Sequence, residues 1–131
     1  EYSNRRPIMG ICLGMQLLAT SSDENGYNKG LDLIPGNVTR LKKNLFHTGW
    51  NTIKCSKNSF FKEFNNKEFY FNHAYSYSNK CKFTTSQTEM NYNIVSIVER
   101  ENILGIQFHP EKSQHNGKLF ISKSIQHLLN A

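Results

Sequence analysis

The sequence predicts an α/β fold built on an open parallel sheet, and two segments near opposite ends of the chain predict it. Residues 7–11 form a short apolar run that leads into the sequence GICLG at positions 10–14. This pattern has the form of a nucleophile elbow, a sharp strand-to-helix turn, with cysteine where hydrolases carry serine. Residues 103–108 form a second apolar run, which ends at His109. Because chemistry in open α/β sheets gathers at the carboxyl ends of strands, we expect both segments at one sheet edge.

The other elements follow from apolar patterning and from the turn-forming residues between the runs. The first strand passes into a helix that begins near Leu13 and continues through Leu18. A polar loop is expected at 21–29, then an apolar segment closed by a Pro-Gly turn at 30–36 and an edge strand at 38–41. A loop at 47–49, four strands and one helical turn follow, the strands at 50–53, 68–72, 81–85 and 93–98 and the turn at 59–64. The last element is a helix from about Asn116, with four apolar residues at helical spacing: Ile121, Ile125, Leu128 and Leu129.

Cys12 is the candidate nucleophile. On an elbow its side chain points out of the sheet, and the flanking glycines let the backbone pack closely. The positive end of the following helix is expected to favour thiolate over thiol. The alternative is a buried structural cysteine on a core strand.

His109 and Glu111 supply the groups that a cysteine nucleophile needs. A base takes the thiol proton, and a third group holds that base in one tautomer. The two residues flank Pro110, whose fixed φ makes the tripeptide rigid. His-Pro alone commonly ends a strand, but its position after a cysteine elbow predicts a catalytic triad of Cys12, His109 and Glu111.

Composition is typical of a globular chain that forms one domain over residues 1–131. The formal net charge is +6, but the basic residues are scattered instead of alternating with stacking aromatics, so nucleic-acid binding is not expected. No apolar run is long enough to cross a membrane, and no signal segment is recognisable. The three cysteines, of which Cys55 and Cys81 are most simply structural, lack metal-ligand spacing. We therefore expect a cytoplasmic protein without metal or cofactor.

The start of the sequence favours a domain whose N-terminal part is missing. Residue 1 is Glu, and Pro7 leads at once into a strand that carries the nucleophile. Such a strand in a parallel sheet needs neighbours to cover it. We expect these residues alone to be inactive and poorly soluble, because one flank of the sheet would lie bare.

With both motifs placed, the chain resembles the glutaminase subunits of imidazole glycerol phosphate synthases, which are class I, or triad, glutamine amidotransferases. Many triad amidotransferases share the elbow and the His-Pro-Glu segment. The sequences GWN at 49–51 and FNHAY at 71–75 point to this subunit, and the matching pieces recur in the family's order over nearly the whole chain. The resemblance implies a flavodoxin-like open sheet.

The resemblance also implies an activity: hydrolysis of glutamine to glutamate and ammonia through a thioester on Cys12. The backbone N–H of Leu13 would stabilise the oxyanion, and four residues would hold the glutamine: Gln16, His73, Ala74 and Tyr75. Ammonia would pass to a barrel-shaped cyclase subunit, the partner in a heterodimer, which makes imidazole glycerol phosphate and AICAR in histidine biosynthesis.

Four residues would lie towards that partner: Trp50, Asn51, Tyr70 and Lys112. For Trp50, packing on a strand is an equal alternative. The chain departs from the family pattern at Phe46, where proline is usual, at Asn72, where valine is typical, and at Ala74, where serine or threonine is typical. The change at Ala74 removes a hydroxyl beside the expected glutamine site.

Three other functions stay open. A paralogous amidotransferase with the same triad supplies ammonia for amidation of surface-polysaccharide sugars. A non-catalytic regulatory subunit could keep the fold, although the intact Cys12, His109 and Glu111 argue against it. A papain-type hydrolase is less favoured, because its sequence signatures are absent.

Overall fold

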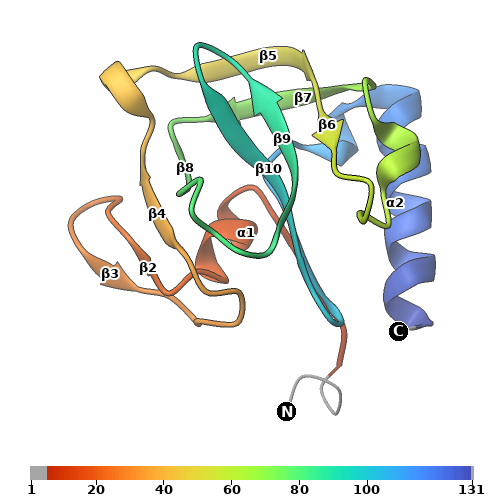
Figure 1. Cartoon of the computed structure of the whole chain (residues 1–131), viewed down its shortest axis with the longest axis horizontal. Coiled ribbons are helices and arrows are strands. Elements are labelled where there is room, and N and C mark those ends of the chain that lie inside the picture. Colours follow the sequence, from red (N-terminus) through yellow and green to blue (C-terminus); the bar gives the residue numbers. More distant parts are fainter. Residues whose placement is uncertain (1–5, 131) are drawn as a thin grey trace.

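The structure, a computed structural model, describes residues 6–130, and its main sheet has five strands in the order β1-β11-β10-β9-β6. The strands are β1 (Ile8–Ile11), β11 (Ile103–Ile106), β10 (Asn93–Arg100), β9 (Thr84–Glu89) and β6 (Lys54–Cys55). β1 and β11 run parallel, whereas the other neighbours are antiparallel. The sheet thus joins the first strand of the chain to the last (Figure 1).

β11 lies inside this sheet because it is apolar at every position. All four of its residues are buried, as is typical of a strand covered on both faces. Helix α1 (Leu13–Leu17) covers one face, where a Cβ on Gly105 would lie 2.9 Å from Met15 Cγ and 2.7 Å from Val98 Cγ2. Glycine at this position therefore allows α1 to approach the strand.

Two smaller sheets complete the strand arrangement. One has the order β3-β2-β4-β8, formed by β3 (Asn28–Lys29), β2 (Ser21–Ser22), β4 (Asn37–Arg40) and β8 (Tyr75–Tyr77). The other pairs β5 (His47–Thr52) with β7 (Glu68–His73), antiparallel, with His47 opposite His73. Short 3₁₀ turns lie at η2 (Lys42–Asn44), η3 (Lys62–Phe64) and η4 (Pro110–Lys112).

The core has two apolar clusters on opposite faces of the main sheet. The cluster under α1 contains Met15 and Ile103, while the other contains Leu104 and Ile106 together with a group of phenylalanines. In that second cluster Phe120 of the C-terminal helix stacks on Phe61, with ring centroids 4.5 Å apart. Alternating side chains of β11 thus anchor both layers.

The C-terminal helix α2 (Gln114–Leu129) buries a stripe that shares only Leu128 with the four apolar residues expected there. Its buried residues are Gly117, Phe120, Ser124 and Leu128, whereas Ile125 is 50% exposed and Leu129 74% exposed. A Cβ on Gly117 would lie 1.8 Å from the Pro110 carbonyl oxygen. This close approach fixes the rotation of the helix, which leaves Ile125 and Leu129 exposed and Ile121 half-buried, while Leu128 is buried as expected.

Several strand predictions need correction. β11 is not in an all-parallel sheet, because β10 pairs with it antiparallel. β4 is not an edge strand, since it lies between β2 and β8. Residues 47–49, expected as a loop, belong to β5, and the strand expected at 81–85 is β9 at Thr84–Glu89. The strands at 7–11, 68–72 and 93–98 and the turn at 59–64 are confirmed in type and place as β1, β7, β10 and η3.

Candidate active site

The elbow is present at Cys12, in the form that the sequence predicted. Cys12 has φ 53° and ψ −106° between β1 and α1, a backbone conformation that L-residues rarely adopt. Its N–H donates to the Ile106 carbonyl at 2.7 Å, which ties the turn to β11. A Cβ on Gly10 would lie 2.6 Å from the Gly14 carbonyl oxygen. The first glycine is therefore required for the chain to reverse so sharply.

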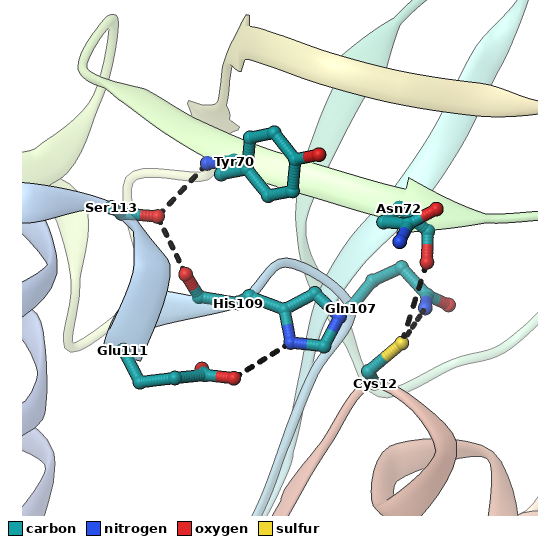
Figure 2. Close-up of polar contacts among 7 residues, drawn as sticks. All are labelled: Cys12, Tyr70, Asn72, Gln107, His109, Glu111 and Ser113. Atoms are coloured by element: carbon teal, nitrogen blue, oxygen red, sulfur yellow. Dashed lines mark hydrogen bonds and ion pairs between the residues drawn. The ribbon is translucent and has the colours of Figure 1, made fainter.

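The Cys12 sulfur contacts one hydrogen-bond acceptor and one hydrogen-bond donor. The thiol donates to the Asn72 carbonyl oxygen at 3.8 Å, and the side-chain amide of Gln107 donates to the sulfur at 3.7 Å (Figure 2). Burial raises the pKa of the Cys12 thiol, and the charges of Glu111 and Glu24 add to this effect. The N–H of Leu13 and the Gln107 amide oppose it. The N–H at the start of α1 thus favours the thiolate, as expected, but burial has the larger effect on the pKa of the thiol.

His109 and Glu111 form a pair beside the cysteine. His109 Nδ1 lies 2.8 Å from Glu111 Oε2, an arrangement that fixes the proton of a neutral ring on Nδ1. Figure 2 shows the imidazole between Glu111 and Cys12, with its free edge turned toward the cysteine. The sheet thus brings together the three residues predicted as a triad.

The backbone around His109 is held to β7. The His109 N–H donates to the Tyr70 carbonyl at 2.8 Å. The buried hydroxyl of Ser113 accepts the Tyr70 N–H at 2.8 Å and donates to the His109 carbonyl at 2.7 Å. These three bonds connect the His-Pro-Glu turn to the neighbouring strand pair, and Figure 2 shows the two that Ser113 makes.

A pocket of about 330 Å³ opens beside Cys12. All five residues expected to contact glutamine line it, together with Glu24, Phe46 and Asn72; the five are Leu13, Gln16, His73, Ala74 and Tyr75. Their contact with glutamine stays a prediction. The position of Asn72 explains one departure from the family pattern, since it is the backbone carbonyl that faces Cys12.

The wall of this pocket is built on a chain of oriented hydrogen bonds. Buried His73 donates from Nδ1 to the Tyr75 carbonyl at 2.9 Å, so its Nε2 accepts from His47 Nδ1 at 2.9 Å. Burial, together with nearby His47 and His109, lowers the pKa of His73 to about 4, although the Tyr75 bond opposes this shift. Burial also lowers the pKa of His47. Both rings are therefore neutral near pH 7.

Comparison with known proteins decides the family. The model of the family described as glutamine amidotransferase class-I matches residues 1–126. The chain belongs to the class-I glutamine amidotransferase family. The imidazole glycerol phosphate synthase subunit HisH of Archaeoglobus fulgidus is 46% identical over 112 residues, covering 82% of this chain and 57% of the relative. The corresponding subunit of Carboxydothermus hydrogenoformans is 40% identical over 131 residues, covering 97% of this chain and 65% of the relative.

Solved structures agree with this amidotransferase fold. PurLQS from Thermotoga maritima matches with TM-score 0.66 at 19% identity, covering 95% of this chain and 61% of that one. A glutamine amidotransferase from the same organism matches with TM-score 0.60 at 23% identity, covering 95% of this chain and 49% of that one. At these identities the likeness concerns the fold alone. The amidotransferase chain spans somewhat under two thirds of the length of the curated relatives it matches.

The residues expected to face a partner differ in exposure and in their contacts. Trp50 is 46% exposed and packs edge-on against Tyr70, with ring centroids 6.1 Å apart. Lys112 is exposed on η4. Asn51 is occupied within the amidotransferase, because its amide donates to His47 Nε2 at 3.3 Å and to the Glu89 carbonyl at 3.2 Å. Their contact with a partner stays a prediction.

The other two cysteines, Cys55 and Cys81, each form a hydrogen bond to a backbone carbonyl. The Cys55 thiol donates to the Phe61 carbonyl at 3.4 Å, and the Cys81 thiol donates to the Pro35 carbonyl at 3.3 Å. Within residues 6–130 no group of three or more possible metal ligands occurs. Over the same residues no helix is long and apolar enough to cross a membrane.

Sequence reasoning missed Gln107 as part of the site. The residue lies inside the motif at the end of β11, yet its type gave no signal, because a glutamine after an apolar strand commonly faces solvent. In the structure it is fully buried and contacts the nucleophile.

Proposed function

We propose that the chain forms the glutamine-hydrolysing part of an imidazole glycerol phosphate synthase and supplies ammonia for histidine biosynthesis. One observation carries the proposal: the elbow cysteine lines the same pocket as the expected glutamine contacts and lies beside the His109–Glu111 pair. The identity to HisH subunits supports the choice among amidotransferases.

The first half of the reaction forms a thioester. The Cys12 thiol gives its proton to His109 Nε2, and the sulfur attacks the side-chain carbonyl carbon of glutamine. The Leu13 N–H beside the sulfur donates to the oxyanion that develops. The tetrahedral intermediate then collapses, the C–N bond breaks, and the His109 proton leaves with ammonia.

The second half restores the cysteine. Water gives a proton to His109 and its oxygen attacks the thioester carbon. The C–S bond breaks, glutamate leaves, and the proton on His109 returns to the sulfur. Glu111 holds the ring through its bond to Nδ1 and stabilises the transient imidazolium.

Because burial raises the pKa of Cys12, the thiol and not the thiolate is the resting form at neutral pH. Proton transfer to His109 therefore coincides with attack, and the resting contact of the thiol with the Asn72 carbonyl must break first. We propose that glutamine binding in the pocket breaks the contact of the thiol with the Asn72 carbonyl, so that the thiol can give its proton to His109. Reactive ammonia then passes to the cyclase subunit.

The test uses the full-length protein mixed with its cognate cyclase subunit, with and without the ribonucleotide that the cyclase converts. We expect glutamine hydrolysis to rise strongly with the nucleotide and to be lost in Cys12→Ala. A rate that the nucleotide leaves unchanged, but that Cys12→Ala abolishes, would favour the polysaccharide-linked paralogue. The absence of any rate in the complex would contradict an enzymatic role.

A further inference from the structure

We infer that Gln107 is a catalytic residue of this site: its buried side-chain amide donates to the Cys12 sulfur and stabilises the thiolate that forms during attack. The inference rests on the proposed function for its place in a reaction. Its structural basis, a donor aimed at the nucleophile, is independent of the substrate.

The position of Gln107 is fixed by its backbone and by complete burial. The residue follows β11 directly, and its N–H donates to the Ser96 carbonyl on β10 at 2.9 Å. Its side chain has 0% exposure. A buried amide left without hydrogen-bond partners is destabilising, so the partners of its oxygen and of its NH₂ group decide its role.

The orientation of the amide follows from its neighbour Gln16. Gln16 Nε2 lies 3.0 Å from the Tyr75 carbonyl oxygen, which can only accept, so the Gln16 nitrogen must be the atom at that point. The same nitrogen lies 3.3 Å from the side chain of Gln107. The Gln107 atom there must be its oxygen. Its NH₂ group is therefore the end that faces the Cys12 sulfur, at 3.7 Å.

This donor acts on both ionisation states of the sulfur. The Asn72 carbonyl can accept only from the neutral thiol and so favours it, whereas Gln107 can donate to thiol and thiolate. Hydrogen bonds to a charged acceptor are about twice as strong as neutral ones. Proton transfer to His109 therefore removes the Asn72 contact and strengthens the Gln107 contact.

The other groups that face the sulfur show why a donor is needed. The carboxylates of Glu111 and Glu24 disfavour the thiolate, as does burial, while the Leu13 N–H and Gln107 favour it. His109, the proton acceptor, lies between Cys12 and Glu111 (Figure 2). Gln107 is thus the one uncharged side chain among these groups that opposes the local negative potential.

The test follows the pH dependence of Cys12 alkylation by iodoacetamide in the full-length protein, with the modified cysteine assigned by peptide mass. In Gln107→Met, which keeps the length and removes the donor, we expect the alkylation midpoint to rise by about one pH unit, a tenfold loss of thiolate. Glutaminase kcat should fall roughly tenfold or more, with KM changed much less. The control Gln87→Met makes the same change on β9 and should leave the midpoint unchanged.

Two further measurements separate this role from simple packing. Gln107→Asn keeps an amide but withdraws it by one methylene, and should shift the midpoint in the same direction. In the unmodified protein the side-chain NH₂ resonances of Gln107 should titrate with the same midpoint as Cys12 alkylation. An unchanged midpoint in a folded variant, or Gln107 resonances that ignore the Cys12 titration, would overturn the inference. Alkylation needs no glutamine, so a protein without glutaminase activity would defeat the proposed function and leave this test intact.

Discussion

At the scale of the residue, Cys12 combines a strained backbone conformation with a buried, protonated thiol. Its positive φ costs on the order of 1–3 kcal/mol, and burial holds its thiol protonated. Both terms serve the proposed reaction. The turn exposes the sulfur to the pocket, and the protonated thiol carries the proton that His109 later passes to ammonia.

The backbone strain at Cys12 predicts a stability gain from an inactivating change. Cys12→Gly relieves the strained conformation, whereas Cys12→Ala keeps it. We expect the glycine variant to be more stable than the alanine variant by about 1 kcal/mol, after the entropic cost of glycine is subtracted. Urea unfolding of the two variants measures the difference. Equal stabilities would show that the elbow stores no strain.

Glu111 is half-exposed, and we expect removal of its charge to lower kcat without abolishing it. Glu111→Gln keeps the shape but removes the charge that stabilises the His109 imidazolium, so kcat should fall by about 10²–10⁴-fold with KM nearly unchanged. Steady-state glutaminase kinetics of the full-length complex provide the measurement. Gln114→Glu, at an exposed residue next to the turn, is the control and should keep the wild-type rate.

At the scale of the element, strands β5 and β7 are joined by two neutral histidines, of which His73 lines the pocket. The tautomers of both rings are set by the Tyr75 carbonyl, which also accepts from Gln16. A shift of this strand pair would therefore move the pocket wall. The pair couples the stability of this element to pH.

This coupling predicts acid destabilisation with a defined window. The pKa of His73 is about 4 in the folded protein and 6.5 in the unfolded chain, so the unfolded state binds the proton first. The contribution of His73 to the free energy of unfolding should be constant above about pH 6.5. It should fall as the pH drops and level off near pH 4, after a loss of roughly 3 kcal/mol. Urea unfolding across this pH range is the measurement. The control His115→Gln, at an exposed histidine on α2, should show the same decline in unfolding free energy as the unchanged protein. In His73→Gln this decline should be largely lost.

The helix α2 yields a prediction that distinguishes its observed face from the expected one. Phe120→Ala should destabilise the protein by about 3–5 kcal/mol, because Phe120 is fully buried among aromatic rings. Leu129→Ala, at a residue 74% exposed, should cost less than about 0.5 kcal/mol. Thermal unfolding of both variants is the measurement. If Leu129→Ala were the more destabilising of the two, the face of α2 that carries Leu129 would be the buried one.

At the scale of the whole molecule, the motifs could be predicted from the sequence because each is local. The elbow at Cys12 and the strand that ends at His109 are encoded by short apolar runs and glycine spacing. Their expected position at one sheet edge is confirmed, because β1 and β11 pair in parallel. The direction of β10 could not be predicted in this way. Its hairpin with β11 turns at Glu101, with φ 52° and no glycine, so the usual turn signal is missing.

Long-range packing also limited the prediction of side-chain roles. The stripe of α2 depends on the contact of Gly117 with the Pro110 carbonyl, two segments whose approach no periodicity encodes. The buried amide of Gln107 is oriented by Gln16, ninety-one positions away. Helical spacing therefore predicted the C-terminal helix but only part of its inward face, and residue type did not predict the burial of Gln107.

The claim that Cys12 performs nucleophilic catalysis is tested most directly by trapping its thioester. Full-length protein in complex with the cyclase subunit is mixed with glutamine, quenched in acid within one turnover, and digested for mass spectrometry. We predict a glutamyl group on the peptide that carries Cys12, absent from Cys12→Ala and hydrolysed on longer incubation. Glutamine turnover without this adduct, or with the adduct on Cys55 or Cys81, would contradict the assignment of Cys12 as nucleophile.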